Sequence, residues 1–587
     1  MKKSWVIIII LFLFILICVF FIQKDYEKTP ETIYINGKII TLNSENFIAS
    51  RMHVKDGKII SIGEIKEYPK KIKVIDLKGA TILPGFIDSH SHVALSSFLD
   101  AMIDLSGFTH KSNEEIWTYL AQQLKTKKEG EWIVCKGIDP ILVEDLKIPN
   151  IHFLDSISPK NPILLISQSL HNYWGNTLAF KKVGINKNTK NPSKNSYYEK
   201  DALGELTGAI VEQKAFLQFS DHLNKSFLSS KNLIKYTIST FKKYAKNGNT
   251  TIVSAGITIN DKKPLRLYEH LSSEKTGFTN QLLSSLGFLP KRQALPRHLL
   301  YIRHDRLFML PETKPLNTDF YGIIGIKHWY DGSPYTGSMY LKEPYLNSDL
   351  SISKLHIKNG HTGKPLIQKQ ELTKFINTYS KKGWQIAIHT QGDKAVEDVL
   401  NVYEKINEKD LFTKLRPRLE HCLLSSVESI EKMKKLNITP SFHINHLYYY
   451  GQKLNDDIIG SERSNAMLPI RHADSLNIKF SLHADQPMFE SNPFRLIQTA
   501  IERKTKEGNY LGKKHRINIL SALKSMTINA AWQIHKEDKI GSLEKGKYAD
   551  FIIVDKNPLT INTSDLSNIK ILNTFVNGNE VLFLTVD

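Results

Sequence analysis

The chain has 587 residues, of which 41% are hydrophobic and 24% charged, and its formal net charge at pH 7 is +20. This length excludes a single small core, and the ordinary composition excludes a chain that is disordered over most of its length. The basic residues are scattered without a stripe of interleaved aromatics, so the charge predicts a lysine-rich solvated surface and no nucleic-acid partner. Three cysteines without a Cys-x-x-Cys pair argue against a disulfide framework.

The N-terminus predicts a membrane segment at residues 1–25. Lys2 and Lys3 precede an unbroken apolar run of 18 residues, 5–22, with no small-residue cleavage site after it. That run is near the lower limit for a spanning helix and longer than a usual signal-peptide core. We expect an uncleaved signal anchor that holds the rest of the protein on the periplasmic or extracytoplasmic side, because the lysines stay in the cytoplasm. The alternative is secretion after signal cleavage.

Both ends of the remaining chain predict small β structures. TIYINGKIITLN (32–43) and ILNTFVNGNEVLFLTV (571–586) are β-branched runs that carry Asn-Gly turns, a pattern typical of antiparallel hairpins. The economical interpretation is one β-sandwich built from both termini, with a first part at 30–83 and a second part at 536–587. Such an arrangement requires only that the termini lie close together in space.

The centre, residues 84–535, alternates short apolar strands with amphipathic helices. This alternation predicts an α/β domain with a parallel sheet. An eight-stranded barrel takes about 250 residues, so the remaining length has room for an insertion. We place the insertion at about 95–250, where the pattern is least regular.

Several predicted strands of the centre end in side chains that bind metals. They are His90 and His92 in GFIDSHSH, Lys327 in GIIGIKHWYDG, His389 in GWQIAIH, His421 in RPRLEH and Asp485 in FSLHAD. The carboxyl ends of barrel strands meet on one face, so we expect these residues to converge. Neutral imidazoles and carboxylates bind divalent metals such as zinc, and a bound zinc activates water and polarises a carbonyl group.

These segments resemble the amidohydrolase superfamily. LPGFIDSHSH is similar to its first-strand signature, and GSLEKGKYADFIIVD is similar to its C-terminal signature. More narrowly, residues 32–580 resemble the YtcJ-like group, amidohydrolase family 3. The matching pieces are HNYWGN (171–176), GNTTIVSAG (248–256), IKHWYDGSP (326–334), IHTQGDKAV (388–396), RPRLEHC (416–422), SLHADQP (481–487) and SNPFRLIQTAIERKT (491–505).

The resemblance implies a distorted (β/α)8 TIM barrel with a composite β-sandwich, and metal-dependent hydrolysis of a C–N bond in a small amide or formamide substrate. Lys327 matches a lysine that, in members with two metals, is carboxylated by CO2 and bridges them. Two other interpretations of Lys327 stay open, an exposed lysine and an ion-pair partner of Asp331. By position, the implied ligands of one or two divalent ions are His90, His92, Lys327, His389, His421 and Asp485.

The resemblance also implies residues around the metal. His171 matches a histidine that faces the substrate and stabilises an oxyanion, with a core or capping role as the alternative. His446, Trp174 and Arg463 are candidate substrate-binding residues, although packing or a surface ion pair explains Trp174 and Arg463 equally well. His443 stands where glutamine is more usual, so no known substrate is transferred to this chain.

We therefore expect an enzyme in which a metal-activated water attacks an amide carbonyl. Asp485 accepts the proton of that water and returns it to the leaving amine. Hydrolysis of a cyclic amide, an ester or a deaminated ring through the same site is an alternative. A membrane-tethered regulatory pseudoenzyme is another, but a degenerate site would lack some of these ligands, and the sequence contains all of them.

Overall fold

The computed structural model describes residues 29–63, 72–193, 196–226, 230–257, 259, 262–313 and 318–583. The predicted anchor, residues 1–25, lies outside these ranges. Within them, no helix combines the length and the apolar composition that crossing a bilayer requires. The predicted membrane-anchored localisation is corrected on this finding, and neither membrane attachment nor an extracytoplasmic location is carried forward.

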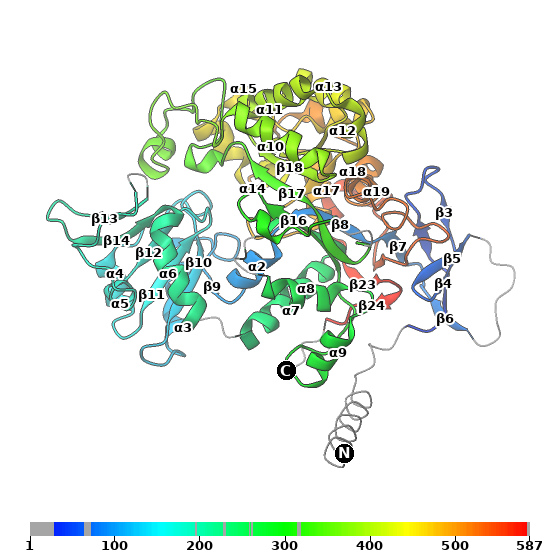
Figure 1. Ribbon diagram of the computed structural model, residues 1–587, viewed down its shortest axis with the longest axis horizontal. Coiled ribbons are helices and arrows are strands. Elements are labelled where there is room, and N and C mark those ends of the chain that lie inside the picture. Colours follow the sequence, from blue (N-terminus) through cyan, green and yellow to red (C-terminus); the bar gives the residue numbers. More distant parts are fainter. Residues whose placement is uncertain are drawn as a thin grey trace, which may run out of the picture.

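Eight parallel strands form a nearly closed barrel at the centre of the molecule (Figure 1). The backbone ladder runs without a break from the first strand to the last, and Ser89 Oγ bridges the remaining seam by donating to Ser481 Oγ at 2.8 Å. The predicted α/β barrel is confirmed. Its strands are β8 (Phe86–Ser91), β15 (Asn249–Ile257), β16 (Arg297–Arg303), β17 (Tyr321–Trp329), β18 (Gln385–Thr390), β19 (Arg418–His421), β20 (Thr439–His443) and β21 (Ser481–His483).

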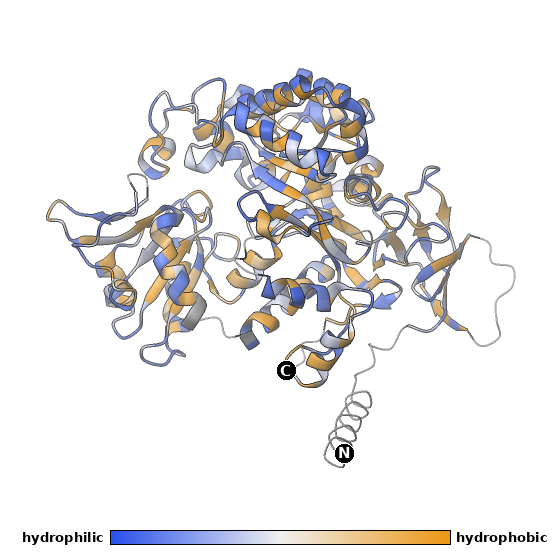
Figure 2. Ribbon diagram, in the orientation of Figure 1, coloured by the Kyte–Doolittle hydropathy of each residue, from blue (hydrophilic) through white to orange (hydrophobic). Residues whose placement is uncertain are grey.

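Amphipathic helices cover the outside of the barrel. In α10, for example, the buried residues Leu372, Ile376 and Ser380 recur every four positions and so share one face. The same alternation gives these helices hydrophobic and hydrophilic stripes (Figure 2). The helices are α7 (Ser230–Lys246), α8 (Lys263–Ser272), α10 (Lys369–Lys381), α11 (Asp393–Ile406), α12 (Lys409–Leu415), α13 (Val427–Leu436), α16 (Ile470–Ser475), α17 (Pro493–Glu502), α18 (Ile519–Ser525) and α19 (Ile528–Gln533).

Between β8 and β15 the chain builds a separate lobe, to the left of the barrel in Figure 1. Its six-stranded sheet has its own hydrophobic core, in which Tyr173 stacks on Phe216 at a ring distance of 4.0 Å. The sheet contains β9 (Ile103–Asp104), β10 (Ile133–Ile138), β11 (Ile163–Ser167), β12 (Asn172–Gly175), β13 (Tyr197–Lys200) and β14 (Leu206–Val211). Its helices are α3 (Asn113–Leu124), α4 (Ile151–Ile157), α5 (Thr177–Lys182) and α6 (Glu212–Ser226).

Two further sheets lie beside the barrel. One has the order β5-β4-β1-β6, and the other has the order β24-β23-β22-β7-β2-β3, in which β22 pairs antiparallel with β7 although some 470 residues separate them. The two sheets share a core in which Tyr34 meets Phe551 edge-to-face at 5.2 Å. Their strands are β1 (Thr32–Ile35), β2 (Lys38–Ile40), β3 (Ile48–Ala49), β4 (Met52–Lys55), β5 (Lys58–Ile62), β6 (Lys73–Asp76), β7 (Thr81–Pro84), β22 (Phe551–Val554), β23 (Ile571–Val576) and β24 (Asn579–Glu580).

Candidate metal centre

A continuous cluster of imidazole rings occupies the carboxyl end of the barrel. Ring centroids lie 4.4 Å apart for His90 and His483, 4.2 Å apart for His389 and His421, and 4.0 Å apart for His443 and His446. The cluster draws on five barrel strands and on the segments that follow them. Its members are His90 on β8, His92 just after it, His389 on β18, His421 on β19, His443 on β20, His446 in α14 (Asn445–Lys453) and His483 on β21.

His90, His92 and Asp485 form a group whose ligand atoms all lie within 4.8 Å of one another. Asp485 Oδ1 is 3.3 Å from His90 Nε2 and 3.0 Å from His92 Nε2. Burial raises the pKa of Asp485, but the hydrogen bond and charge of His92, with further positive neighbours, outweigh it and hold that pKa well below its usual range. Two imidazoles and an ionised carboxylate are thus brought together, a donor set that suits zinc.

Lys327 on β17 points into the same cluster. Its side chain is fully buried, and Nζ lies 3.4 Å from His90 Nε2. The interpretation as an exposed lysine is therefore wrong. Asp331 uses its carboxylate to accept the backbone N–H groups of Tyr340, Gln391 and Gly392 at 2.9–3.0 Å. Burial lowers the pKa of Lys327 to about 8, despite the nearby carboxylates of Glu420 and Asp485.

His389 and His421 lie in the same cluster, and the ring of His421 is 4.7 Å from that of His90. His421 Nδ1 is 3.9 Å from Asp485 Oδ2, and His389 Nε2 is 3.4 Å from the carbonyl oxygen of Gly332. His421 has a positive φ of 74°, which turns the backbone at the end of β19. Burial lowers the pKa of His389 to about 3 and holds the pKa of His421 well below its usual range. Both imidazoles are therefore neutral near pH 7 and have lone pairs for a metal.

Sequence reasoning missed Glu420 and Arg418, which orient His90. Glu420 is fully buried and contacts His90 Nδ1, while Arg418 binds it through Nε–Oε1 at 2.8 Å and Nη2–Oε2 at 3.1 Å. This contact makes Nδ1 of His90 the N–H donor and leaves Nε2 as the ligand atom. The signal in the sequence was the spacing of Arg418 and Glu420 in RPRLEH, because residues two apart on a strand share a face.

The remaining predicted residues lie in different surroundings. His171 pairs with Glu212 in the inserted lobe, Nδ1 to Oε2 at 3.0 Å, and both side chains are partly exposed. Trp174 is buried in the core of that lobe, away from solvent. Arg463 donates to the backbone carbonyl oxygens of Ile459, Glu343 and Pro344. Of the candidate substrate-binding residues, only His446 joins the imidazole cluster.

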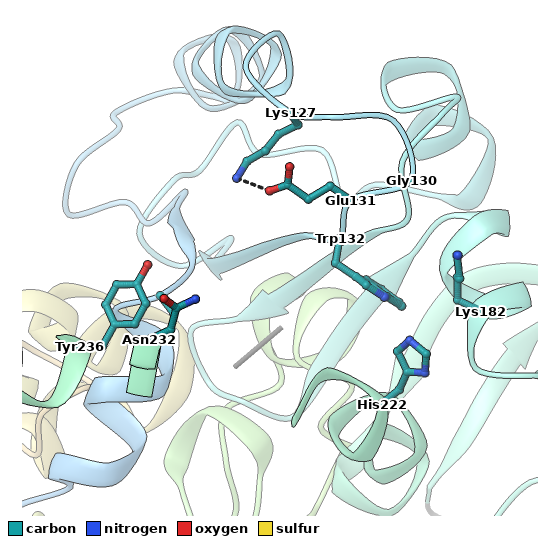
Figure 3. A pocket seen from close by; sticks show the side chains of 9 residues that line it. Lys127, Gly130, Glu131, Trp132, Lys182, His222, Asn232 and Tyr236 are labelled. Carbon is teal, nitrogen blue, oxygen red and sulfur yellow. Dashed lines mark hydrogen bonds and ion pairs between the residues drawn. The ribbon is translucent and has the colours of Figure 1, made fainter. Parts of the chain in front are cut away.

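A cavity of about 510 Å³ lies beside the inserted lobe (Figure 3). Trp132, His222 and Tyr236 line it, and Lys127 Nζ binds Glu131 Oε1 at 3.1 Å on its wall. No residue of the imidazole cluster is in its lining. This cavity is therefore separate from the candidate metal centre.

Several buried nitrogens of the cluster lack a hydrogen-bond partner and could therefore face a metal. Within the described ranges, these atoms are His421 Nδ1, His443 Nδ1, His446 Nε2 and both ring nitrogens of His483. A buried polar atom without a partner costs about 1–3 kcal/mol. A bound divalent cation would remove that cost, so the residues present fit the metal that sequence analysis predicted.

Comparisons with known proteins agree with this architecture. A sequence model described as "Amidohydrolase family" matches residues 73–582. The N-substituted formamide deformylase of Arthrobacter pascens is 25% identical over 93% of this chain and 97% of its own length. YtcJ of Bacillus subtilis (strain 168) is 25% identical over 93% of this chain and 98% of its own. The crystal structure of an uncharacterized metal-dependent hydrolase from Pyrococcus horikoshii OT3 superposes with a TM-score of 0.69, at 23% identity over 91% of this chain and 99% of that one.

Proposed function

Because the chain belongs to the amidohydrolase family, we propose that it hydrolyses a C–N bond in a small amide or formamide-like substrate with a metal-activated water. The observation that carries this proposal is the convergence of His90, His92 and Asp485 beside the buried Lys327. The similarity to an N-substituted formamide deformylase supports a formamide-like substrate. Zinc suits the nitrogen and oxygen donors best.

His90, His92, His389, His421 and Asp485 are the proposed protein ligands. These residues would hold a zinc ion, which would lower the pKa of a bound water molecule and polarise the substrate carbonyl. Burial lowers the pKa of His90, His389 and His421, so these three contribute neutral nitrogens.

Asp485 is the proposed general base and general acid. Its carboxylate is ionised and its side chain keeps 17% of its surface exposed, so it can reach an incoming water. It takes a proton from the attacking water and then gives that proton to the leaving amine. If the leaving nitrogen were not protonated, the substrate would have to expel an amine anion, and an amine anion is a poor leaving group.

Lys327 is the proposed site of carboxylation if two ions bind. An amine must be neutral to add to CO2, and the reaction yields a carbamate and releases a proton. With a pKa of about 8, about a tenth of Lys327 is neutral at pH 7. The carbamate would place two anionic oxygens next to His90, where an ammonium group offers none.

The test combines metal content with a substrate screen. We expect purified protein to contain zinc-like ions by elemental mass spectrometry and to hydrolyse N-substituted formamides or amides. Asp485→Asn should lower kcat/KM by about 10²–10⁴-fold, the usual size of a general acid–base contribution. Cyclic amides and esters belong in the same screen, because turnover of these alone would move the activity to the alternative bond class. A protein that holds no metal after zinc is supplied would refute the proposal in favour of a non-catalytic role.

A further inference from the structure

The cavity of about 510 Å³ beside the inserted lobe lies between two parts of the chain (Figure 3). The lobe contributes Trp132, which precedes β10, Lys182, which ends α5, and His222 in α6. The barrel helix α7 contributes Tyr236. Ligand pockets in proteins have volumes of about 300–1,000 Å³ and often form where two structural units meet. The size and the place of this cavity therefore suit a small organic molecule.

The cavity and the imidazole cluster lie at opposite ends of β10. Trp132 directly precedes this strand, whereas Asp139 directly follows it and accepts the hydroxyl group of Tyr450 at 2.6 Å. Tyr450 lies in α14, the helix that carries His446. The 6 residues of β10 span about 20 Å. A small molecule in the cavity would therefore not touch the proposed metal ligands.

Trp132 brings a hydrogen-bond donor to the wall of the cavity. The residue is only 7% exposed, and its ring lies 5.5 Å from that of His222. Among the described residues, none accepts a hydrogen bond from its Nε1–H group. By contrast, the same group of Trp117 in this lobe donates to Asn113 Oδ1 at 2.9 Å. A buried indole N–H group usually has an acceptor, so a molecule in the cavity would supply the one that the protein does not.

The wall of the cavity also has an uncompensated positive charge. Lys127 Nζ binds Glu131 Oε1 at 3.1 Å, so these two charges compensate each other. Lys182 has no carboxylate partner within the part of the chain that the structure describes. In Figure 3 it lies on the same side of the cavity as Trp132. An ammonium group and an indole N–H group both donate and never accept, so this side favours a negatively charged acceptor.

We propose that the cavity binds a small aromatic anion. Its carboxylate or phosphate group accepts hydrogen bonds from Lys182 Nζ and Trp132 Nε1, because both acids offer charged oxygen atoms. Its ring packs among the rings of Trp132, His222 and Tyr236, which favour a flat apolar body. The inference does not rest on the proposed function, because none of the proposed metal ligands lines the cavity.

The experiment is isothermal titration calorimetry of the full-length protein with 2-naphthoate, 2-naphthyl phosphate and the neutral 2-naphthylmethanol. We expect at least one of the two anions to bind, and the alcohol to bind about tenfold more weakly. Lys182→Met should weaken binding of the anion about tenfold, because it removes a charged donor. Trp132→Phe keeps an aromatic ring but removes the N–H group, so it should weaken binding about fivefold.

Lys181→Met is the matched control for Lys182→Met. Both lysines are exposed and adjacent in α5, but Lys181 lines a different cavity. Its loss should leave the affinity unchanged. An equal effect of the two lysine variants would overturn the proposal, because the anion would then respond only to general surface charge. Circular dichroism reports folding, and Lys182→Met alone still tests the site if Trp132→Phe fails to fold.

The other outcomes also decide the proposal. If neither anion binds at millimolar concentration, or if the alcohol binds as tightly as the anions, the proposal is overturned. An anion held at the metal centre would be released by a chelator and by Asp485→Asn, and it would bind Lys182→Met as tightly as the wild type. That result would overturn the cavity site and leave the proposed function standing. Loss of affinity in Lys182→Met and Trp132→Phe, with Asp485→Asn unaffected, supports the cavity site whether or not the protein hydrolyses an amide.

Discussion

Burial lowers the pKa of the basic groups at the metal centre and raises the pKa of the acidic ones, because it disfavours every charged form. It disfavours the protonated imidazole, so the pKa of His446 falls to about 3, and it disfavours the ammonium group of Lys327. It also disfavours a carboxylate, yet the charge and hydrogen bond of His92 keep Asp485 ionised. Before any metal binds, the protein thus presents neutral nitrogens and an anionic oxygen, which are the protonation states that ligands need.

Loss of the Glu420 charge should destabilise the fold and weaken metal binding. Glu420→Gln keeps the shape of the side chain but removes the charge that faces Arg418, so a buried cation is left uncompensated. We expect a loss of about 3–5 kcal/mol in the free energy of unfolding. Because His90 loses its charged orienting partner, metal affinity should also fall by about 10–100-fold. Urea unfolding and competition with a chelator measure the two effects.

A matched control for this variant is Glu404→Gln. Glu404 binds Lys432 at 2.6 Å, but its side chain is 48% exposed. Its loss should change the free energy of unfolding much less than Glu420→Gln does and leave metal affinity unchanged, because water screens surface ion pairs. Equal effects from the two variants would contradict a special role for Glu420.

At the scale of elements, β16 joins the barrel to the sheets at its side. Arg297, at the start of β16, is fully buried and binds Asp550 through Nη2–Oδ1 at 2.9 Å. Its guanidinium lies over the rings of Phe320 and Tyr548, 3.8 and 4.4 Å from their centroids. Asp550 precedes β22, so this ion pair ties the C-terminal sheet to the barrel.

Arg297→Met tests this link. Methionine replaces the apolar stem of the arginine but leaves Asp550 buried without its countercharge. We therefore expect the free energy of unfolding to fall by about 3–5 kcal/mol. Arg303→Ala, at the other end of the same strand, removes a partly exposed ion pair with Asp305 and should cost less than about 1 kcal/mol. Thermal denaturation of both variants makes the comparison. If Arg297→Met were as stable as the wild type, apolar packing alone would hold the sheets to the barrel.

For the whole molecule, the buried histidines predict instability in acid. Burial lowers the pKa of His298, His389 and His446 to about 3, whereas an unfolded histidine titrates near 6.5. Between about pH 3 and pH 6.5, the unfolded chain therefore binds more protons at these histidines than the folded chain does. The stability that these groups contribute is present above pH 6.5 and is lost as the pH falls toward 3, by about 1.4 kcal/mol per pH unit for each group.

Chemical unfolding of chelator-treated protein at pH 7, 6 and 5 measures this loss. We expect the free energy of unfolding to fall steeply below pH 6.5. Zinc added at pH 7 should raise it, because only the folded chain assembles the ligands. A free energy that stays constant from pH 7 to pH 5 would contradict the neutral, buried state of these imidazoles.

The sequence by itself determined the barrel and the strand ends on which His90, His92, Lys327, His389, His421 and Asp485 lie. These features follow from local patterns, because the period of apolar residues defines a strand and a polar residue after it marks the strand end. The roles of these residues as ligands stay predictions, as do the domain boundaries. The predicted membrane anchor rested on local hydropathy alone, and the described structure gave it no support.

Only the tertiary structure decided which side chains meet. Closure of the barrel brings side chains of β8 and β19 together, so Glu420 contacts His90 across 330 residues of sequence. No local period encodes such a contact, and for that reason the role of Glu420 beside His90 escaped sequence reasoning. The same holds for Trp174 and Arg463, whose residue types fit a substrate pocket. Their packing partners place one in the core of the lobe and tie the other to three carbonyl oxygens.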